Sequence, residues 1–256
     1  MILMTRRFLS LLAMLCVAML VAGDAAYAAV TVTTSQNIAP DGGAAHDPYD
    51  PATDTPGSGP MMSASSTDIA QGLTATYMGG SDDPGYELST GVAAWTDGSL
   101  ATVYPENGPG GDAVDHAGYG TVGPNGDATF DLGGFYNLSQ VDVFAGWNDS
   151  GRDAISFELQ VSADDAVYSL IASYTKGPDD TGQITVPVTN LYSIADDGGA
   201  DIASAVRYVR LHVTDADNGH AGVVEVDIFG TQVPEPSTCL LAGLALLGCA
   251  KLRRRR

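Results

Sequence analysis

The sequence predicts an all-β protein, built as an antiparallel sandwich of two sheets. Three observations support this fold class: short runs of alternating apolar and polar residues recur from about residue 67 onward, clusters of Gly, Asp and Pro separate them, and no helical periodicity lasts longer than one turn. Eight or so strands of this kind, joined by long Gly/Asp-rich loops, are typical of a β-sandwich.

Alternation gives the bounds of the expected strands. The clearest run is 155–161, in which every second residue is apolar and the residues between are Ser, Glu and Gln. The runs 206–214 and 223–229 alternate in the same way, and their apolar residues are expected to face one shared core. These residues are Val209, Leu211, Val213, Val224, Val226 and Ile228. The other expected strands are 29–34, 73–78, 128–132, 139–145, 167–174 and 183–188.

The first 66 residues are predicted to form two segments that precede the folded domain. Residues 1–28 resemble a secretory signal peptide, with two arginines, an apolar run over 8–22 and a small-residue cleavage site, so we expect cleavage after Ala28. Residues 29–66 are expected to form a short strand followed by a linker or long loop, since the Pro, Gly and Asp of 36–66 bury too little to order the chain. The predicted sandwich then spans 67–231.

The charge of the exported body excludes one class of partner. The chain has 11 Lys+Arg and 31 Asp+Glu. Without the signal and the C-terminal tail, four basic and 29 acidic residues remain, a formal charge of −25. Such a field repels nucleic acid and favours divalent cations. All three cysteines lie in the apolar ends of the chain, so the body has neither disulfides nor thiol chemistry.

The C-terminal stretch, 232–256, has three parts in a fixed order. Val233, Pro234, Glu235 and Pro236 are followed by an apolar segment over 239–250 and then by a Lys/Arg cluster. This arrangement resembles the PEP-CTERM sorting signal. The resemblance implies processing by an exosortase-like enzyme, export to the cell surface or extracellular matrix of a Gram-negative bacterium, and transient anchoring in the inner membrane. An ordinary membrane anchor is the alternative, although the apolar segment is shorter than the ~20 residues of a comfortable span.

Four motifs within residues 91–230 resemble discoidin, or F5/8 type C, domains. They are Phe130-Asp131-Leu132-Gly133 with the strand after it, the strand and hairpin 157–165, Ala205-Val206-Arg207-Tyr208-Val209-Arg210-Leu211, and the closing strand 222–230. Thr96-Asp97-Gly98 resembles the early Asp-Gly turn of that family, and Asp165 stands where the family usually has Gly. The resemblance implies a galactose-binding-like jelly roll.

The same resemblance implies one bound Ca²⁺. Many members of this fold bind calcium where the early Asp-Gly loop meets the last strand, and calcium prefers hard oxygen ligands. The matching positions here are Asp97, Thr102 and Glu225, with Ser99 nearby. The alternatives are that Asp97 caps its own turn and that Glu225 is a solvated or ion-paired carboxylate.

Carbohydrate binding needs aromatic faces and polar groups on loops at one end of the sandwich. Trp147 and Arg152 lie in one expected loop, His116 and Tyr119 in a Gly-rich loop, and His220 just before the last strand. The alternative is that Trp147 covers the edge of the core and that Arg152 pairs with an acidic neighbour.

The sequence contains no pattern typical of an enzyme. The four histidines have no metal-ligand spacing, and the body has no Gly-x-Ser-x-Gly elbow, phosphate loop or cysteine nucleophile. The leading hypothesis is therefore a non-enzymatic, exported protein that binds extracellular polysaccharide. An acidic structural matrix protein without a discrete ligand is the alternative, and a secreted hydrolase is a distant third.

Overall fold

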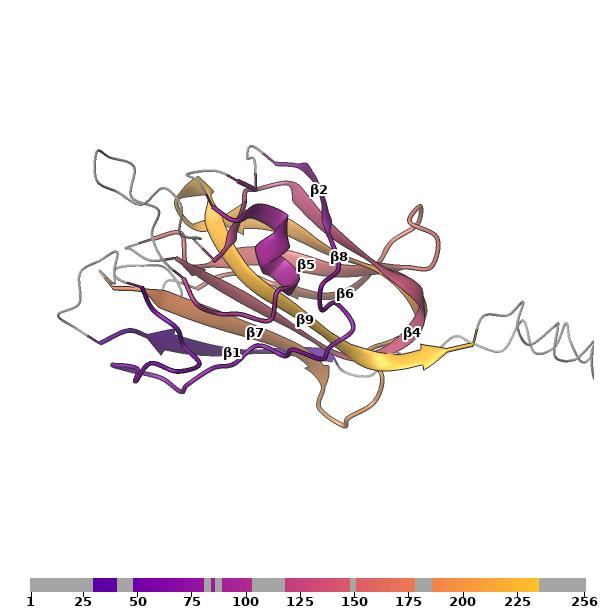
Figure 1. Cartoon of the computed structure of the whole chain (residues 1–256). Helices are drawn as coiled ribbons and strands as arrows, with labels where there is room; N and C mark the ends of the chain where they lie inside the picture. The colour runs from indigo at the N-terminus through magenta and orange to yellow at the C-terminus, as the bar shows by residue number, and fades with distance from the viewer. Residues whose placement is uncertain are drawn as a thin grey trace, which may run out of the picture.

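A computed structural model of the chain describes residues 30–40, 48–80, 84–85, 89–102, 118–147, 151–177 and 186–234. These residues form nine strands and two short 3-10 helices, so the all-β prediction is confirmed (Figure 1). The strands are β1 (Val30–Ile38), β2 (Thr76–Gly79), β3 (Gly120–Val122), β4 (Gly126–Trp147), β5 (Ile155–Ser162), β6 (Ser169–Tyr174), β7 (Val188–Asp196), β8 (Ala203–Ala216) and β9 (Ala221–Val233). The helices are η2 (Gly91–Thr96) and η3 (Asp217–Gly219).

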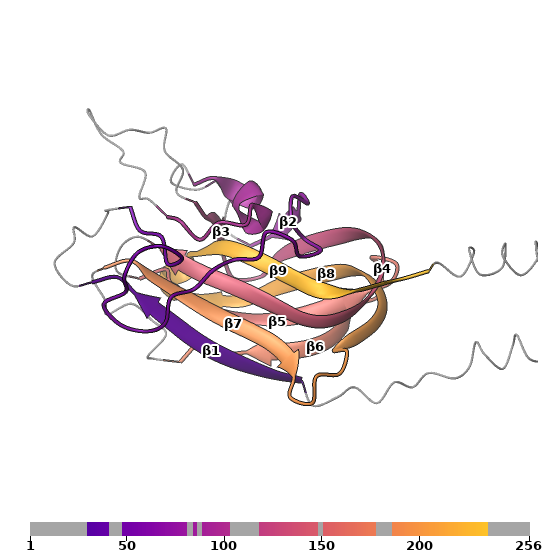
Figure 2. The same ribbon diagram turned by 60° about the horizontal axis from the view of Figure 1, so that its bottom comes forward.

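The 22-residue strand β4 belongs to both layers of the sandwich. Its first part, 126–131, pairs with β2 and β8, whereas its last part, 140–147, pairs with β7 and β9. Between them the register shifts, and Gly133 adopts a φ of 71° that favours glycine. One sheet therefore runs β2-β4-β8-β5-β6 and the other β1-β7-β4-β9-β3, with every pair antiparallel (Figure 2).

The main core lies between the two sheets. Phe130, Phe157 and Tyr192 are fully buried there, and the alternating valines and leucines of β5, β8 and β9 fill the remaining space. The expected facing of β8 and β9 is confirmed for all but one residue. Val224 lies on the opposite face, because β9 skips a pairing position between the partners of Phe144 and Ala145.

A covering layer, residues 48–72 and 89–102, lies over the outer face of β9 (Figure 1). A second apolar cluster forms beneath it from Met62, Leu100, Tyr119, Phe144 and Val224. The backbone of Tyr49 pairs with that of Thr102 at N–O distances of 2.9 and 2.8 Å. Residues 48–66 are irregular, as expected of a long loop, but Tyr49 and Met62 are both 6% exposed. The segment is therefore packed on the sandwich and is more than a linker.

Some of the expected strands agree with the observed strands and others do not. The runs at 155–161, 206–214 and 223–229 match β5, β8 and β9, but the two runs at 128–132 and 139–145 are parts of the single strand β4. The strand expected at 29–34 extends to Ile38, those at 73–78 and 167–174 correspond to β2 and β6, and β7 was not predicted. Most of the strand expected at 183–188 lies outside the described residues.

The sandwich has two distinct ends. Val30 pairs with Asp196 and Phe135 pairs with Val233, so the first strand begins and the last strand ends at one end, the tail end (Figure 2). Trp147 pairs with Val188 at the opposite end, the loop end. In the part of the chain that is described, no helix is both long and apolar enough to span a bilayer.

Candidate functional site

Helix η2 places the early turn, residues 97–99, over the outer face of β9. The side chain of Trp95 in this helix is fully buried, and its Nε1 donates to the carbonyl of Gly120 at 3.2 Å. Its ring meets that of Tyr77 edge-on at 5.8 Å. The sequence did not single out Trp95, which precedes the Asp-Gly pair and fixes where Asp97 lies.

The early turn and the last strand meet through Glu225. Gly98 N–H donates to Oε2 of Glu225 at 2.8 Å, and Ser99 N–H donates to Oδ1 of Asp97 at 2.9 Å. Glu225 is 0% exposed, and its Oε1 has no hydrogen-bond partner among the described residues. Because Glu225 alternates with the core residues Val226 and Ile228, its side chain faces away from the main core and its carboxyl group lies beneath the turn.

The electrostatics of this pair favour a bound positive species. Burial raises the pKa of Glu225 to about 9; the Gly98 N–H opposes this shift, and Asp227, Asp97 and Asp68 add to it. Burial also raises the pKa of Asp97. The Ser99 N–H and the side chain of Glu225 oppose this shift. Two carboxylates close together repel each other unless a proton or a cation lies between them.

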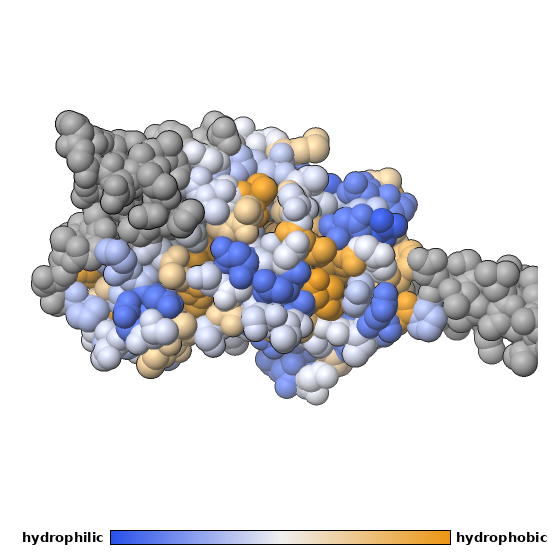
Figure 3. Space-filling view, viewed as in Figure 1, coloured by the Kyte–Doolittle hydropathy of each residue, from blue (hydrophilic) through white to orange (hydrophobic). Residues whose placement is uncertain are grey.

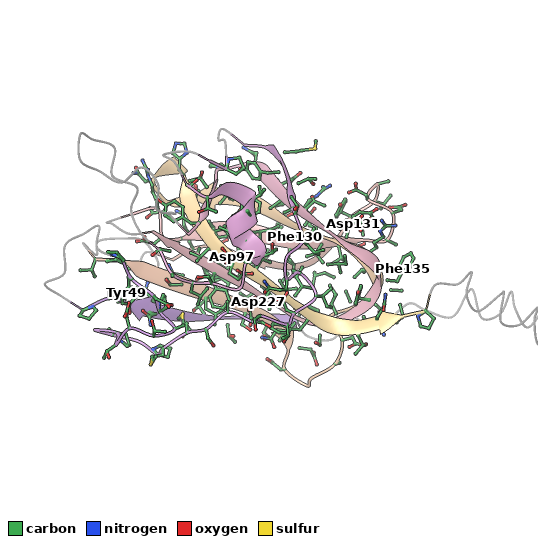
Figure 4. The ribbon with its side chains drawn as sticks, in the orientation of Figure 1. Tyr49, Asp97, Phe130, Asp131, Phe135 and Asp227 are labelled. Atoms are coloured by element: carbon green, nitrogen blue, oxygen red, sulfur yellow. The ribbon has the colours of Figure 1, made fainter. Side chains whose placement is uncertain are left out.

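A row of carboxyl groups that the sequence analysis missed continues along β9. Asp227 is 2% exposed; its Oδ2 accepts the Ser65 N–H at 2.8 Å, and burial raises its pKa to about 7, helped by Asp68 and Asp142. Asp68 comes from the covering layer, and its Oδ1 accepts the Ile228 N–H at 3.1 Å. These groups connect the covering layer to the sheet (Figure 4).

Three of the four predicted calcium ligands line one cavity. A cavity of about 650 Å³ lies between Tyr49 and the early turn, and its described lining includes Asp97, Ser99 and Thr102. Figure 4 shows Asp97 near the centre of this face and Tyr49 toward the loop end. The surrounding surface mixes hydrophilic and apolar residues (Figure 3).

The donor set limits how a metal could be bound. Within the described part of the chain, no three His, Cys, Asp or Glu residues are grouped so as to hold a metal ion. Asp97 and Glu225 therefore supply two carboxylates at most, and a calcium ion would need neutral oxygens as well. The unpartnered Oε1 of Glu225 fits such an ion, whereas Oγ of Ser99 already accepts the Ala101 N–H at 3.2 Å.

The predicted carbohydrate-binding residues are only partly brought together. Asp217 accepts the Arg152 N–H through Oδ2 at 2.9 Å and, through its backbone carbonyl, the His220 N–H at 3.2 Å. Arg152 and His220 thus belong to one hydrogen-bonded pair of loops at the loop end, where β4 also ends at Trp147.

The remaining two of the five predicted ligand residues, Tyr119 and His116, are not described at the surface of the loop end. Tyr119 is 0% exposed within the second apolar cluster, so its ring face is not presented at the surface, and a ligand role for it stays a prediction. The cause of this burial is packing: Tyr119 sits beneath the covering layer, which sequence patterning did not reveal. His116 lies outside the described residues.

Several solved structures are similar to this chain at low identity. A chitosan-binding module of a chitosanase/glucanase from Paenibacillus sp. IK-5 has 18% identity and a TM-score of 0.41, over 64% of this chain and 99% of the module. A Clostridium perfringens CBM32 module in complex with GalNAc-β-1,3-galactose has 17% identity and a TM-score of 0.43, over 64% and 99%. A family 89 glycoside hydrolase from the same organism has 20% identity and a TM-score of 0.39, over 66% of this chain but 15% of the hydrolase.

These likenesses are too distant to carry a function across, and no curated protein matches the chain. One comparison is specific to the tail. Residues 232–256 match the family model described as the PEP-CTERM protein-sorting motif. The motif begins inside β9, and the strand ends at Val233, directly before the first proline. The chain therefore carries a β-sandwich body followed by a PEP-CTERM sorting signal.

Proposed function

We propose that this protein is an exported, non-enzymatic carbohydrate-binding protein whose sandwich binds extracellular polysaccharide at its loop end. One observation carries the proposal: the sorting motif follows β9 at the tail end, while Trp147, Arg152 and His220 belong to the opposite end. Strand β7, Val188–Asp196, connects the two ends over about 26 Å at 3.3 Å per residue. A module held by its tail would thus direct these loops outward.

The route to the surface is part of the proposal. An exosortase-like enzyme would recognise the motif at Val233, Pro234, Glu235 and Pro236 in a Gram-negative bacterium, with the apolar segment anchoring the chain in the inner membrane until processing. Mass spectrometry of the exported protein tests this step. A mature chain that ends near Pro236 supports processing, and a mature chain that retains Arg256 contradicts it.

We also propose one Ca²⁺ between the early turn and β9. The orphaned Oε1 of Glu225, the nearby carboxyl of Asp97 and the high pKa of Glu225 are the support. Ser99 and Thr102 are the neutral ligands that the family resemblance implies. When bound, the ion would supply a positive charge between the buried carboxylate of Glu225 and the carboxylate of Asp97, and so link the covering layer to the last strand.

A glycan array, probed with and without calcium, tests carbohydrate binding. Wild type is expected to bind a neutral bacterial polysaccharide saturably, and Trp147→Ala is expected to lose that binding because sugars stack on aromatic faces. The matched control is Tyr208→Ala, since Tyr208 is a half-buried aromatic on β8 away from the loop end. Equal binding by wild type and Trp147→Ala would contradict the assignment of the loop end.

The acidic matrix protein is retained as a second candidate because of Tyr119. With its ring buried, one fewer aromatic face is available for a sugar. A body with a formal charge of −25 would then act by holding water and bridging calcium. Absence of binding to every glycan, with calcium binding intact, would favour this candidate over the first.

A further inference from the structure

A segment of the covering layer, residues 65–73, is fastened over the early turn at both of its ends. At the first end, Ser65 N–H donates to Oδ2 of Asp227 at 2.8 Å. At the second, Gly72 N–H donates to the carbonyl of Thr96 at 2.8 Å, and Oγ1 of Thr96 donates to the carbonyl of Leu73 at 2.6 Å. We call residues 65–73 the clasp; they precede the part of the chain that resembles discoidin domains.

The side chain of Gln71 extends from the clasp toward the early turn. Its Nε2 donates to the carbonyl of Thr96 at 3.1 Å, which fixes the orientation of the amide, since only the nitrogen can donate. Its Oε1 lies 2.8 Å from the position that a Cβ atom on Gly98 would occupy. Gly98 is the residue whose N–H binds Glu225, so Gln71 and Glu225 both lie against Gly98.

Both side chains present an unused acceptor oxygen there. Within the described residues, Oε1 of Gln71 and Oε1 of Glu225 are buried and have no hydrogen-bond partner. A buried acceptor without a donor is costly, and two of them against one glycine are unusual unless a positive group serves both. Amide and carboxylate oxygens are the ligands that calcium prefers.

The shortage of carboxylates explains why an amide is needed. No third acidic or His side chain within the described residues completes a metal site around Asp97 and Glu225, so the remaining ligands must be neutral oxygens. Among the side chains near the turn, Gln71 offers such an oxygen without another partner, in addition to Oγ of Ser99, which already accepts the Ala101 N–H through one of its lone pairs.

We propose that Gln71 is a ligand of the cation bound by Glu225, and that the cation fastens the clasp onto the sandwich. This inference rests on the calcium site put forward under the proposed function. It adds a ligand from outside the discoidin-like motifs and gives the ion a second role, which is to hold residues 65–73 in place.

Three variants of the full chain test the proposal. Gln71→Leu removes the oxygen and keeps the approximate size, while Gln71→Glu keeps the oxygen and adds a negative charge. Gln160→Leu is the matched control, because Gln160 is a half-buried glutamine on β5 whose Nε2 donates to Glu158 at 2.8 Å. Calorimetric titration with Ca²⁺ is expected to show about tenfold weaker binding for Gln71→Leu, tighter binding for Gln71→Glu and unchanged binding for the control.

Terbium luminescence separates a ligand from a merely structural residue. Lifetimes of bound Tb³⁺ in H₂O and D₂O report the number of coordinated waters, and Gln71→Leu is expected to gain about one water as the lost oxygen is replaced. Limited proteolysis is expected to cut Gln71→Leu within residues 65–73 even when calcium is present.

The outcomes separate this inference from the calcium site itself. If wild type and Gln71→Leu bind Ca²⁺ equally and hold the same number of waters on Tb³⁺, Gln71 is not a ligand and the inference fails while the calcium site stands. If wild type binds neither ion and Glu225→Gln changes nothing, both fail together.

Discussion

The predicted calcium ligands and the predicted carbohydrate-binding residues differ in how closely the fold brings them together. Asp97 and Ser99 lie on the early turn, which a hydrogen bond of 2.8 Å from Gly98 ties to Glu225, and Thr102 follows three residues later. The predicted carbohydrate-binding residues are divided: Arg152 and His220 meet around Asp217, whereas Tyr119 is buried in an apolar cluster. In the first group, Glu225 lies beneath the covering layer and the other three residues belong to that layer, whereas Arg152 and His220 lie at the loop end.

This difference shows which kind of site a family pattern can locate. Positions in the early turn are fixed by the backbone of the sandwich, because the turn must meet the last strand. Loop residues such as Arg152, with a φ of 71°, depend on local turns that differ between relatives. Four predictions test the contrast, from the largest expected effect to the smallest.

Trp95→Ala is expected to destabilise the protein by about 3–5 kcal/mol, because it empties a fully buried indole site and loses the hydrogen bond to Gly120. Since Trp95 holds the early turn, calcium binding should weaken as well, while the loop end keeps its glycan affinity. Urea denaturation measures the first effect and calorimetry the second. The control Met78→Ala, at a side chain that is 72% exposed, should change stability by no more than about 0.5 kcal/mol.

The pH dependence of metal-free protein should report Glu225. Its pKa is about 9 in the folded chain against an ordinary value of 4.5, so the folded state binds more protons between these values and stability falls as pH rises through this window. We expect the Tm in a chelator to drop by about 5 °C or more from pH 5 to pH 9. Glu225→Gln cannot ionise and should flatten the curve; parallel curves for the two proteins would show that Glu225 is not the responsible group.

Asp217→Ala should separate the two regions functionally. It removes the acceptor for the Arg152 N–H and is expected to cost about 1 kcal/mol. Glycan binding at the loop end should weaken because Arg152 loses one of the hydrogen bonds that hold it, although backbone hydrogen bonds still join the loops, while the affinity for calcium stays the same. Asp196→Ala is the matched control at the tail end, where Asp196 accepts the Gly198 and Ala200 N–H groups, and it should leave both activities intact.

Ala205→Gly should have the smallest effect and the opposite sign. Ala205 has a φ of 53°, a left-handed conformation that glycine adopts without strain. Substitution is expected to stabilise the protein by up to about 1 kcal/mol, measured as a higher Tm. Because Ala205 lies near the tail end, away from both groups, a change in calcium or glycan binding would mean that the two regions are coupled through the sandwich.

Much of the fold could be predicted because its strands alternate cleanly. β5 and β8 alternate between buried apolar and more exposed polar residues, whereas β9 alternates in polarity but is buried on both faces, and the hydrophobic effect fixes which face turns inward. Strand β4 was predicted as two strands because Gly133 and Gly134 resemble a turn, although the chain continues there from one sheet into the other. Clean alternation therefore predicts that a strand exists, but it does not show whether two neighbouring runs belong to one continuous strand.

The contents of the covering layer could not be predicted from pattern alone. The bulge at Val224 reverses the facing of one residue, and nothing in the run Val223-Val224-Glu225 marks it. The burial of Tyr119 and the contact of Gln71 with the early turn are long-range consequences of how residues 48–72 pack. The motif residues Asp97 and Glu225 were found because their positions recur within a family, and Gln71 was missed because it precedes those motifs.

The sorting motif begins within the last strand, so almost no linker separates the sandwich from the motif. Val233 still pairs with Phe135, and the sorting motif starts at residue 232. A flexible linker of 20 residues would let a module wander through roughly 25 Å and face any direction. Because the motif begins within a β-strand, an anchor attached directly behind Val233 would also restrict the orientation of the sandwich, and neighbouring copies on one surface would then share a similar orientation.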